Sequence, residues 1–205
     1  MMVSKLVFLV EEPSMEAFLH ALLPRILPGN VTFDVHPFQG KSDLLRKLRN
    51  RLCGYAQWLP KDWRIIVIVD RDDNDCLQLK KQLEEIALQV KLCTRSNAVG
   101  GVWQVVNRIA IEELEAWYFG DWQAVCSAFP KVSQNIVSKA AYRDPDSIKG
   151  GTWEVFEYVL QRYGYFKAGF RKIEAAKLMG ECLDPVRNRS KSFTTFNSAL
   201  VEIFD

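Results

Sequence analysis

The sequence predicts an α/β protein with a mostly parallel four-stranded sheet, helices on both faces and a helical C-terminal extension. Two apolar runs, 5–10 and 65–69, end abruptly in acidic residues. The second run is almost entirely β-branched, which indicates a strand buried on both faces. Strand and helix patterns alternate up to about residue 120, and none of the later segments has a convincing strand pattern. We therefore expect an α/β domain over 1–120 and a helical extension over 121–205 that packs on it.

Periodicity and end signals define the individual elements. Strands are expected at 5–10, 31–36, 65–69 and 105–111, with the second nearer an edge of the sheet. Beyond residue 120, helices are expected at 121–129, 133–141, 153–163 and 172–179, and a last one ends at Phe204.

Capping residues predict where the helices between the strands begin and end. Expected caps are Ser14 for the first helix, Ser42 or Asp43 for the second, and Asp75 with Gln78 for the third. Proline ends helices, so Pro24 and the turn at 28–30 should close the first one.

Composition excludes several classes of protein. Hydrophobic residues make up 48% of the chain and charged residues 25%, as in ordinary globular proteins. The absence of an apolar run near 20 residues, and of a small-residue cleavage site near the start, predicts a cytoplasmic protein without a membrane partner. Five scattered cysteines without a CxxC pair predict reduced thiols.

Acidic residues at the predicted strand ends are the strongest functional signal. Asp70 and Asp72 follow one buried strand, and Glu11 follows another. Residues two apart in an extended chain point the same way, and the carboxyl ends of parallel strands bind ligands. We therefore expect Glu11, Asp70 and Asp72 to hold Mg²⁺, with Mn²⁺ as a substitute. The alternative is that these acids are solvated loop residues.

A fourth metal ligand is expected from the segment after the last strand. Glu115 lies on a helix that Trp117 should partly bury, where an unpaired carboxylate is costly. The alternative is a salt bridge from Glu115 to a nearby cation, with Lys139, Arg171 and Lys172 as candidates. Weaker candidates for the acidic site are Glu12, Glu16, Asp73, Asp75, Glu112 and Glu113.

Basic residues gather in two segments, 41–64 and 162–191, although the net charge is only +2. Such surfaces beside an acidic pocket suit a polyanionic substrate, and the alternative is ordinary solvated helix faces. Lys41, Lys139 or Lys172 could stabilise charge that develops on a phosphate. The loop 187–191 offers further phosphate-contacting groups, or is simply solvated. Gly40-Lys41-Ser42 favours a P-loop only weakly, because Val35 stands where its first glycine belongs. The sequence contains no GxSxG nucleophile motif.

Glu11 after the first strand and the Asp-Arg-Asp sequence at 70–72 resemble the Toprim domain of topoisomerases, primases and overcoming-lysogenization-defect nucleases. In detail the chain resembles an uncharacterised bacterial Toprim-like family, a domain of unknown function. The resemblance rests on EEPS (11–14), GKSDL (40–44), VDRDD (69–73), ELEAW (113–117), YRDPD (142–146) and NRSKSF (188–193). It implies a Rossmann-like sheet, a magnesium site and genes beside ABC-type ATPases in anti-phage defence operons. Toprim domains usually have glycine after the catalytic glutamate, where this chain has Glu12.

Two functional hypotheses follow. The first is a Mg²⁺-dependent nuclease that cleaves DNA or RNA, gated by a partner ATPase, with Glu11, Asp70, Asp72, Lys41 and Lys172 as catalytic residues. The second is a non-catalytic subunit that binds nucleic acid or the ATPase.

Overall fold

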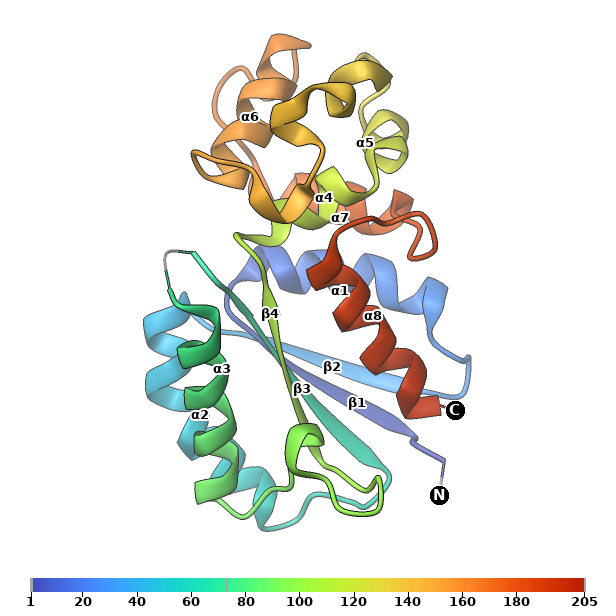
Figure 1. Ribbon diagram of the computed structural model, residues 1–205. Helices are drawn as coiled ribbons and strands as arrows, with labels where there is room; N and C mark the ends of the chain where they lie inside the picture. Colours follow the sequence, from blue (N-terminus) through green and yellow to red (C-terminus); the bar gives the residue numbers. More distant parts are fainter. Residues whose placement is uncertain (1, 73, 205) are drawn as a thin grey trace.

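One four-stranded parallel sheet forms the centre of the protein. The computed structural model describes residues 2–72 and 74–204 (Figure 1). The strands are β1 (Lys5–Val10), β2 (Thr32–Pro37), β3 (Trp63–Asp70) and β4 (Val105–Ala110), in the order β2-β1-β3-β4. All neighbouring pairs are parallel, with Val10 opposite Ile68 and Asp70 opposite Ala110. The ends of β1, β3 and β4 therefore meet at one edge, and β2 is an edge strand, as predicted.

Eight α-helices lie in the described parts of the chain. They are α1 (Pro13–Ile26), α2 (Lys41–Ala56), α3 (Cys76–Gln89), α4 (Leu114–Gly120), α5 (Trp122–Ala128), α6 (Thr152–Arg162), α7 (Lys172–Cys182) and α8 (Lys191–Phe204). Short 3₁₀ turns lie at Arg95–Asn97, Gln134–Ser138, Ala140–Tyr142 and Pro145–Ser147. The predicted α/β class and the helical C-terminal part are confirmed.

Three predicted helix boundaries are wrong. Glu12 is the N-cap of α1, and Ser14 lies inside the helix, where its hydroxyl donates to the Glu12 carboxylate. Pro24 lies inside the last turn of α1 and does not end it; the helix continues to Ile26 and ends just before the predicted turn at 28–30. Gly40 precedes α2 with a φ of 89°, a left-handed conformation that glycine adopts without strain. By contrast, Asp75 caps α3 by accepting a hydrogen bond from Gln78 N, as predicted.

Both faces of the sheet are covered. Alternate residues of each strand point to opposite faces, so Val7 and Leu9 pack under α2 and α3, while Leu6, Phe8 and Val10 pack on the other face. Figure 1 shows α2 and α3 on one side of the sheet and α1 with α8 on the other. The C-terminal segment thus supplies α8 to the layer over the sheet. The division into two domains at residue 120 stays a prediction.

The remaining helices, α4 to α7, lie beyond the carboxyl end of β4 (Figure 1). Trp117 of α4 joins them to the sheet layer, because its ring stacks on Phe196 at 5.1 Å and also contacts Phe18 and Phe193. None of the helices in 2–72 and 74–204 is long and apolar enough to cross a bilayer.

Helices α1 and α7 approach each other closely at Gly180. A Cβ atom there would lie 2.4 Å from the Phe18 carbonyl oxygen and 2.8 Å from Ala21 Cβ. Glycine therefore allows α7 to lie directly against α1.

We expect Gly180→Ala to lower the free energy of unfolding by about 1–3 kcal/mol, because the added methyl group must push the two helices apart. Gly54→Ala in α2 is the matched control, since nothing lies within 4 Å of that position; it should be neutral or stabilising by up to about 1 kcal/mol. Urea unfolding of both variants measures this. Equal effects at the two positions would contradict the close packing of α1 on α7.

Candidate functional site

Glu11 and Asp70 meet at the carboxyl edge of the sheet. Because β1 and β3 are hydrogen-bonded neighbours, their ends deliver both residues to one place. Glu11 Oε2 accepts a hydrogen bond of 3.0 Å from the backbone N–H of Asp70. Asp70 itself is only 7% exposed. Burial raises the pKa of Asp70 well above its usual value, and repulsion from Glu11 and Glu115 raises it further. Burial also raises the pKa of Glu11 to about 7, against the opposing effect of the Asp70 N–H.

Glu115 joins this cluster from the first turn of α4. Its side chain is 2% exposed, and burial raises its pKa to about 8. Within 2–72 and 74–204 it forms no ion pair, so the expected alternative of a salt bridge to Lys139, Arg171 or Lys172 is wrong for the described residues. The nearby positive charge of Lys172 acts on Glu115 without direct contact.

Tyr118 is a member of the cluster that the sequence did not single out. It lies one helical turn after Glu115, and its buried hydroxyl has no hydrogen-bond partner among the described residues. Burial raises its pKa, and the negative charges of Glu115, Glu12 and Asp70 raise it further. The i, i+3 spacing on one helix face was the sequence signal that could have identified it.

Asp72 and Lys41 adopt a different arrangement from the one expected. β3 ends at Asp70, and Asp72 has a φ of 46°, so the extended-chain argument for parallel Asp70 and Asp72 side chains fails. The Asp72 carboxylate instead pairs with Lys41 Nζ at 2.7 Å. Lys41 also donates to the Arg71 carbonyl at 2.9 Å and to Asn74 Oδ1 at 2.8 Å. Lys41 thus holds the loop after β3, and Asp72 stays close enough to raise the pKa of Glu11.

Lys172 is the cation whose charge acts on Glu115 of the acidic cluster. It begins α7 and is half-buried, and its Nζ lies 4.8 Å from the centre of the Trp153 ring. Burial lowers its pKa, but the carboxylates of Glu115 and Glu12 outweigh this effect, so its pKa is raised.

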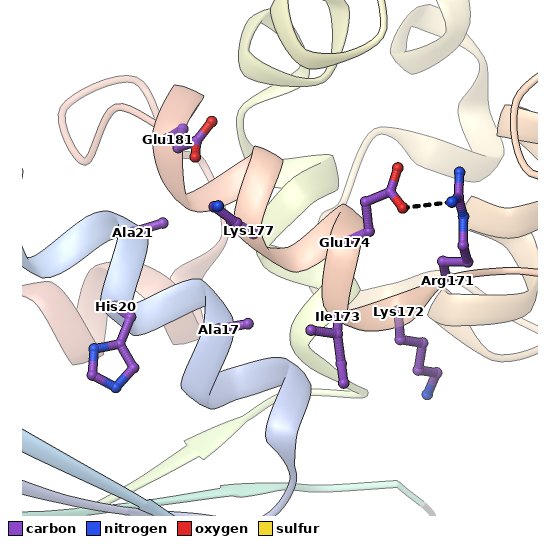
Figure 2. A pocket seen from close by; sticks show the side chains of 9 residues that line it. All are labelled: Ala17, His20, Ala21, Arg171, Lys172, Ile173, Glu174, Lys177 and Glu181. Atoms are coloured by element: carbon purple, nitrogen blue, oxygen red, sulfur yellow. Dashed lines mark ion pairs between the residues drawn. The ribbon is translucent and has the colours of Figure 1, made fainter.

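Lys172 also lines an open groove between α1 and α7, shown in Figure 2. The groove has a volume of about 970 Å³. Ala17 and Ala21 of α1 face α7 across it, and Lys177 and Arg171 lie on the α7 side (Figure 2). Arg171 pairs with Glu174 at 2.9 Å. One cation therefore belongs both to the groove and to the acidic cluster.

The weaker acidic candidates have structural partners. Glu113 accepts hydrogen bonds of 2.9 Å from both Thr152 Oγ1 and Trp153 N at the start of α6. Glu112 pairs with Arg71, and the Asp75 side chain caps α3. The Glu12 carboxylate accepts the Ser14 hydroxyl and lies near enough to raise the pKa of Asp70, and Glu16 lies in the first turn of α1. Asp73 lies outside the described residues. In the loop 187–191, Arg187 pairs with Asp121 at 3.0 Å, so that arginine fixes the fold rather than facing solvent freely.

The donor set fits a hard divalent cation by its chemistry. Glu11, Asp70 and Glu115 provide carboxylate oxygens, the ligands that Mg²⁺ prefers, and Tyr118 adds an unpartnered hydroxyl oxygen. A cation among them would relieve the burial of like charges. The side chains are not already arranged as ligands, because residues 2–72 and 74–204 contain no group of three or more His, Cys, Asp or Glu side chains positioned to hold a metal. Rotation of carboxylates is therefore required for binding.

The fold and site define an all-parallel α/β protein with buried acids at the carboxyl edge of its sheet. A family model described as a domain of unknown function, DUF4276, matches residues 10–201. The chain therefore belongs to that family. Neither a curated protein nor a solved structure matches it.

The raised pKa of Glu115 predicts a pH-dependent stability. The folded state binds this proton more tightly than the unfolded state. Protonated Glu115 therefore adds its full contribution to the free energy of unfolding below about pH 4.5, and this contribution is lost as the pH rises through about 8. Between pH 4.5 and 8 the free energy of unfolding should fall by a value on the order of 4 kcal/mol. Glu115→Gln should remove this part of the pH dependence and be more stable than the parent at pH 8.

Urea unfolding at a series of pH values measures the effect. Glu181→Gln, which removes an exposed carboxylate on α7, is the control and should follow the parent curve. A parent and a Glu115→Gln variant with parallel curves would contradict the buried, protonated state of Glu115.

Proposed function

We propose that this protein is a Mg²⁺-dependent nuclease of the Toprim type that cleaves nucleic-acid phosphodiesters. The observation that carries the proposal is the burial of Asp70 beside Glu11 and Glu115 at the carboxyl edge of a parallel sheet. Burying several carboxylates together without a cation is unfavourable, and such groups mark candidate functional sites. The Toprim-like order of Glu11 and the Asp-Arg-Asp sequence gives the reaction class.

The chain's own residues suggest how the site would work. Glu11, Asp70 and Glu115 would hold the ion, which would supply a Lewis acid and an activated water. Lys172 stands next to the acids and would stabilise charge on the phosphate. Asp72 and Lys41 would act together by fixing the loop after β3, and Asp72 would become a ligand only after leaving Lys41.

The groove between α1 and α7 gives a route for the substrate. Its α7 side carries three cations, of which Arg171 pairs with Glu174, and its α1 side carries apolar alanines. Glu174 and Glu181 also line the α7 side, so Lys172 and Lys177 are the cations left to meet a polyanion. A polyanion bound there would meet Lys172 immediately beside the acidic cluster. From the resemblance we further propose that the protein acts in the cytoplasm in an anti-phage role with an ABC-type ATPase.

A second candidate function is a non-catalytic subunit that binds nucleic acid or an ATPase. It is favoured by the engagement of Asp72 with Lys41 and by the lack, among the described residues, of acids already arranged as metal ligands. Glu12 in place of the usual glycine also favours it, because this side chain restricts the approach of a phosphate to the backbone.

Cleavage of plasmid DNA and of total RNA, with Mg²⁺, Mn²⁺ or a chelator, tests the two candidates. We expect metal-dependent cleavage that falls about 100-fold or more in Asp70→Asn and in Glu115→Gln, since each removes a charged ligand while keeping the shape. Asp34→Asn is the matched control, because it removes a partly exposed aspartate of β2 that pairs with Lys5; it should retain activity.

Calorimetric titration with Mg²⁺ measures metal binding in the parent and in the variants independently of cleavage. Full cleavage by the double variant Asp70→Asn with Glu115→Gln would overturn the site. Nucleic-acid binding without cleavage under any metal would favour the second candidate.

A further inference from the structure

Another cavity, of about 280 Å³, lies between α3 and α8 beside β4, which is the edge strand on the opposite side of the sheet from β2. It shares no residue with the acidic cluster or the groove. Its lining comes from α3, from β4 and the residue after it, and from α8: Cys76, Leu77, Lys80, Asn107, Arg108, Ile109, Ile111, Lys191, Ser192 and Thr195. This set contains three cationic side chains and no acidic one. The cavity is therefore chemically suited to an anion.

Arg108 is the unusual residue of this cavity. It is only 8% exposed, yet it forms no ion pair within 2–72 and 74–204. Its Nη1 donates to the Asn107 carbonyl at 3.1 Å, and its buried Nε has no hydrogen-bond partner in the described chain. A buried guanidinium is expensive unless an anion and several acceptors satisfy it. The fold alone does not satisfy this one.

The neighbouring acids bind other residues and make no ion pair with Arg108 among the described residues. Glu202 of α8 is held by Arg95, and Glu84 Oε1 of α3 is held by Lys80 at 2.8 Å, whereas the buried Glu84 Oε2 has no partner in the described chain. Burial and the positive charge of Arg95 lower the pKa of Arg108 to about 10, against the opposing effects of Glu202 and Glu84. A bound anion would offset this loss of stability of the charged guanidinium.

The backbone N–H groups at the start of α8 already have an acceptor, so side chains must bind an anion in this cavity. Asp146 accepts the backbone N–H groups of Lys191 and Ser192 at the start of α8. The Lys191 side chain remains exposed, and Lys80 lies on the opposite side of the cavity on α3. Lys80 is already engaged, because its Nζ pairs with Glu84 and donates to the Asn107 carbonyl at 2.7 Å. Arg108 of β4 and Lys191 of α8 are therefore the two lining cations without an ion pair in the described chain.

Apolar residues form the rest of the lining. Ile109 and Ile111 are partly buried, and Leu77 is 80% exposed at the cavity rim. A small anion alone would leave these surfaces uncovered. A phosphate joined to a nucleoside would place its charge on the cations and its base on the apolar rim.

We propose that this cavity binds the phosphate group of a nucleotide, free or within a nucleic-acid strand, and that Arg108 is its principal ligand. The proposal is independent of the nuclease function, because none of the residues involved belongs to the acidic site.

Calorimetric titration at low salt tests the proposal with three probes: inorganic phosphate, adenosine monophosphate and a single-stranded oligonucleotide without terminal phosphates. We expect Arg108→Met to weaken binding by about tenfold or more, because a charge-assisted bidentate contact is lost. Arg49→Met, which removes an exposed cation from α2, is the control and should bind like the parent. Preference for the monophosphate over the oligonucleotide identifies a free nucleotide, and the reverse preference identifies a strand.

Thermal unfolding without ligand distinguishes binding from a structural role. Arg108→Met should melt at the same temperature as the parent or higher, since it removes a buried charge and loses only the hydrogen bond to the Asn107 carbonyl and no ion pair of the described chain. Lys191→Met, an exposed change, keeps the test valid should Arg108→Met fail to fold, and it should weaken binding several-fold. Equal affinity of the parent and these variants for all three probes, or no binding of any probe by the parent, would overturn the proposal.

Discussion

The burial of carboxylates at the carboxyl edge of the sheet is the constraint from which the rest of the account follows. Asp70 ends β3, whose preceding residues 65–69 are all buried, so the parallel register that builds the core also takes this carboxylate out of water. Glu11 and Glu115 arrive at the same place from β1 and α4. A group of like charges in a low-dielectric setting must bind protons, a cation or a partner.

The C-terminal helices make this burial possible. α4 carries Glu115 and Tyr118 over the sheet edge, and α7 brings Lys172 beside them. The close contact of α7 with α1 at Gly180 fixes that position. α8 then returns to cover the sheet, and Trp117 connects it to α4 by a hydrogen bond of 2.9 Å to Ser192 and by stacking on Phe196. The helical extension is thus part of the acidic site and not only an appendage to the sheet.

Much of the fold could be predicted from the sequence, because buried parallel strands are long β-branched runs and the helices between them have clear periodicity. The approach of Glu11 to Asp70 followed from the same rule about strand ends. The orientation of Asp72 could not be predicted, because it depends on a left-handed backbone conformation and on the three hydrogen bonds of Lys41. The burial of Arg108 without an ion pair among the described residues could not be predicted either, because the sequence of a strand does not show which acids will surround a cation within it. Capping was predicted well only where a side chain makes the cap, as Asp75 does.

Carbon-13 NMR titration of the side-chain carboxyl groups shows directly whether Glu11, Asp70 and Glu115 form a buried cluster that binds a cation. With Glu11, Asp70 and Glu115 assigned by substitution, the account predicts a pKa near 8 for Glu115 and raised values for Asp70 and Glu11 in metal-free protein. Saturating Mg²⁺ should lower the pKa of all three, because a bound cation favours the ionised carboxylates. Ordinary pKa values in the metal-free protein, unchanged when Mg²⁺ is added, would contradict it.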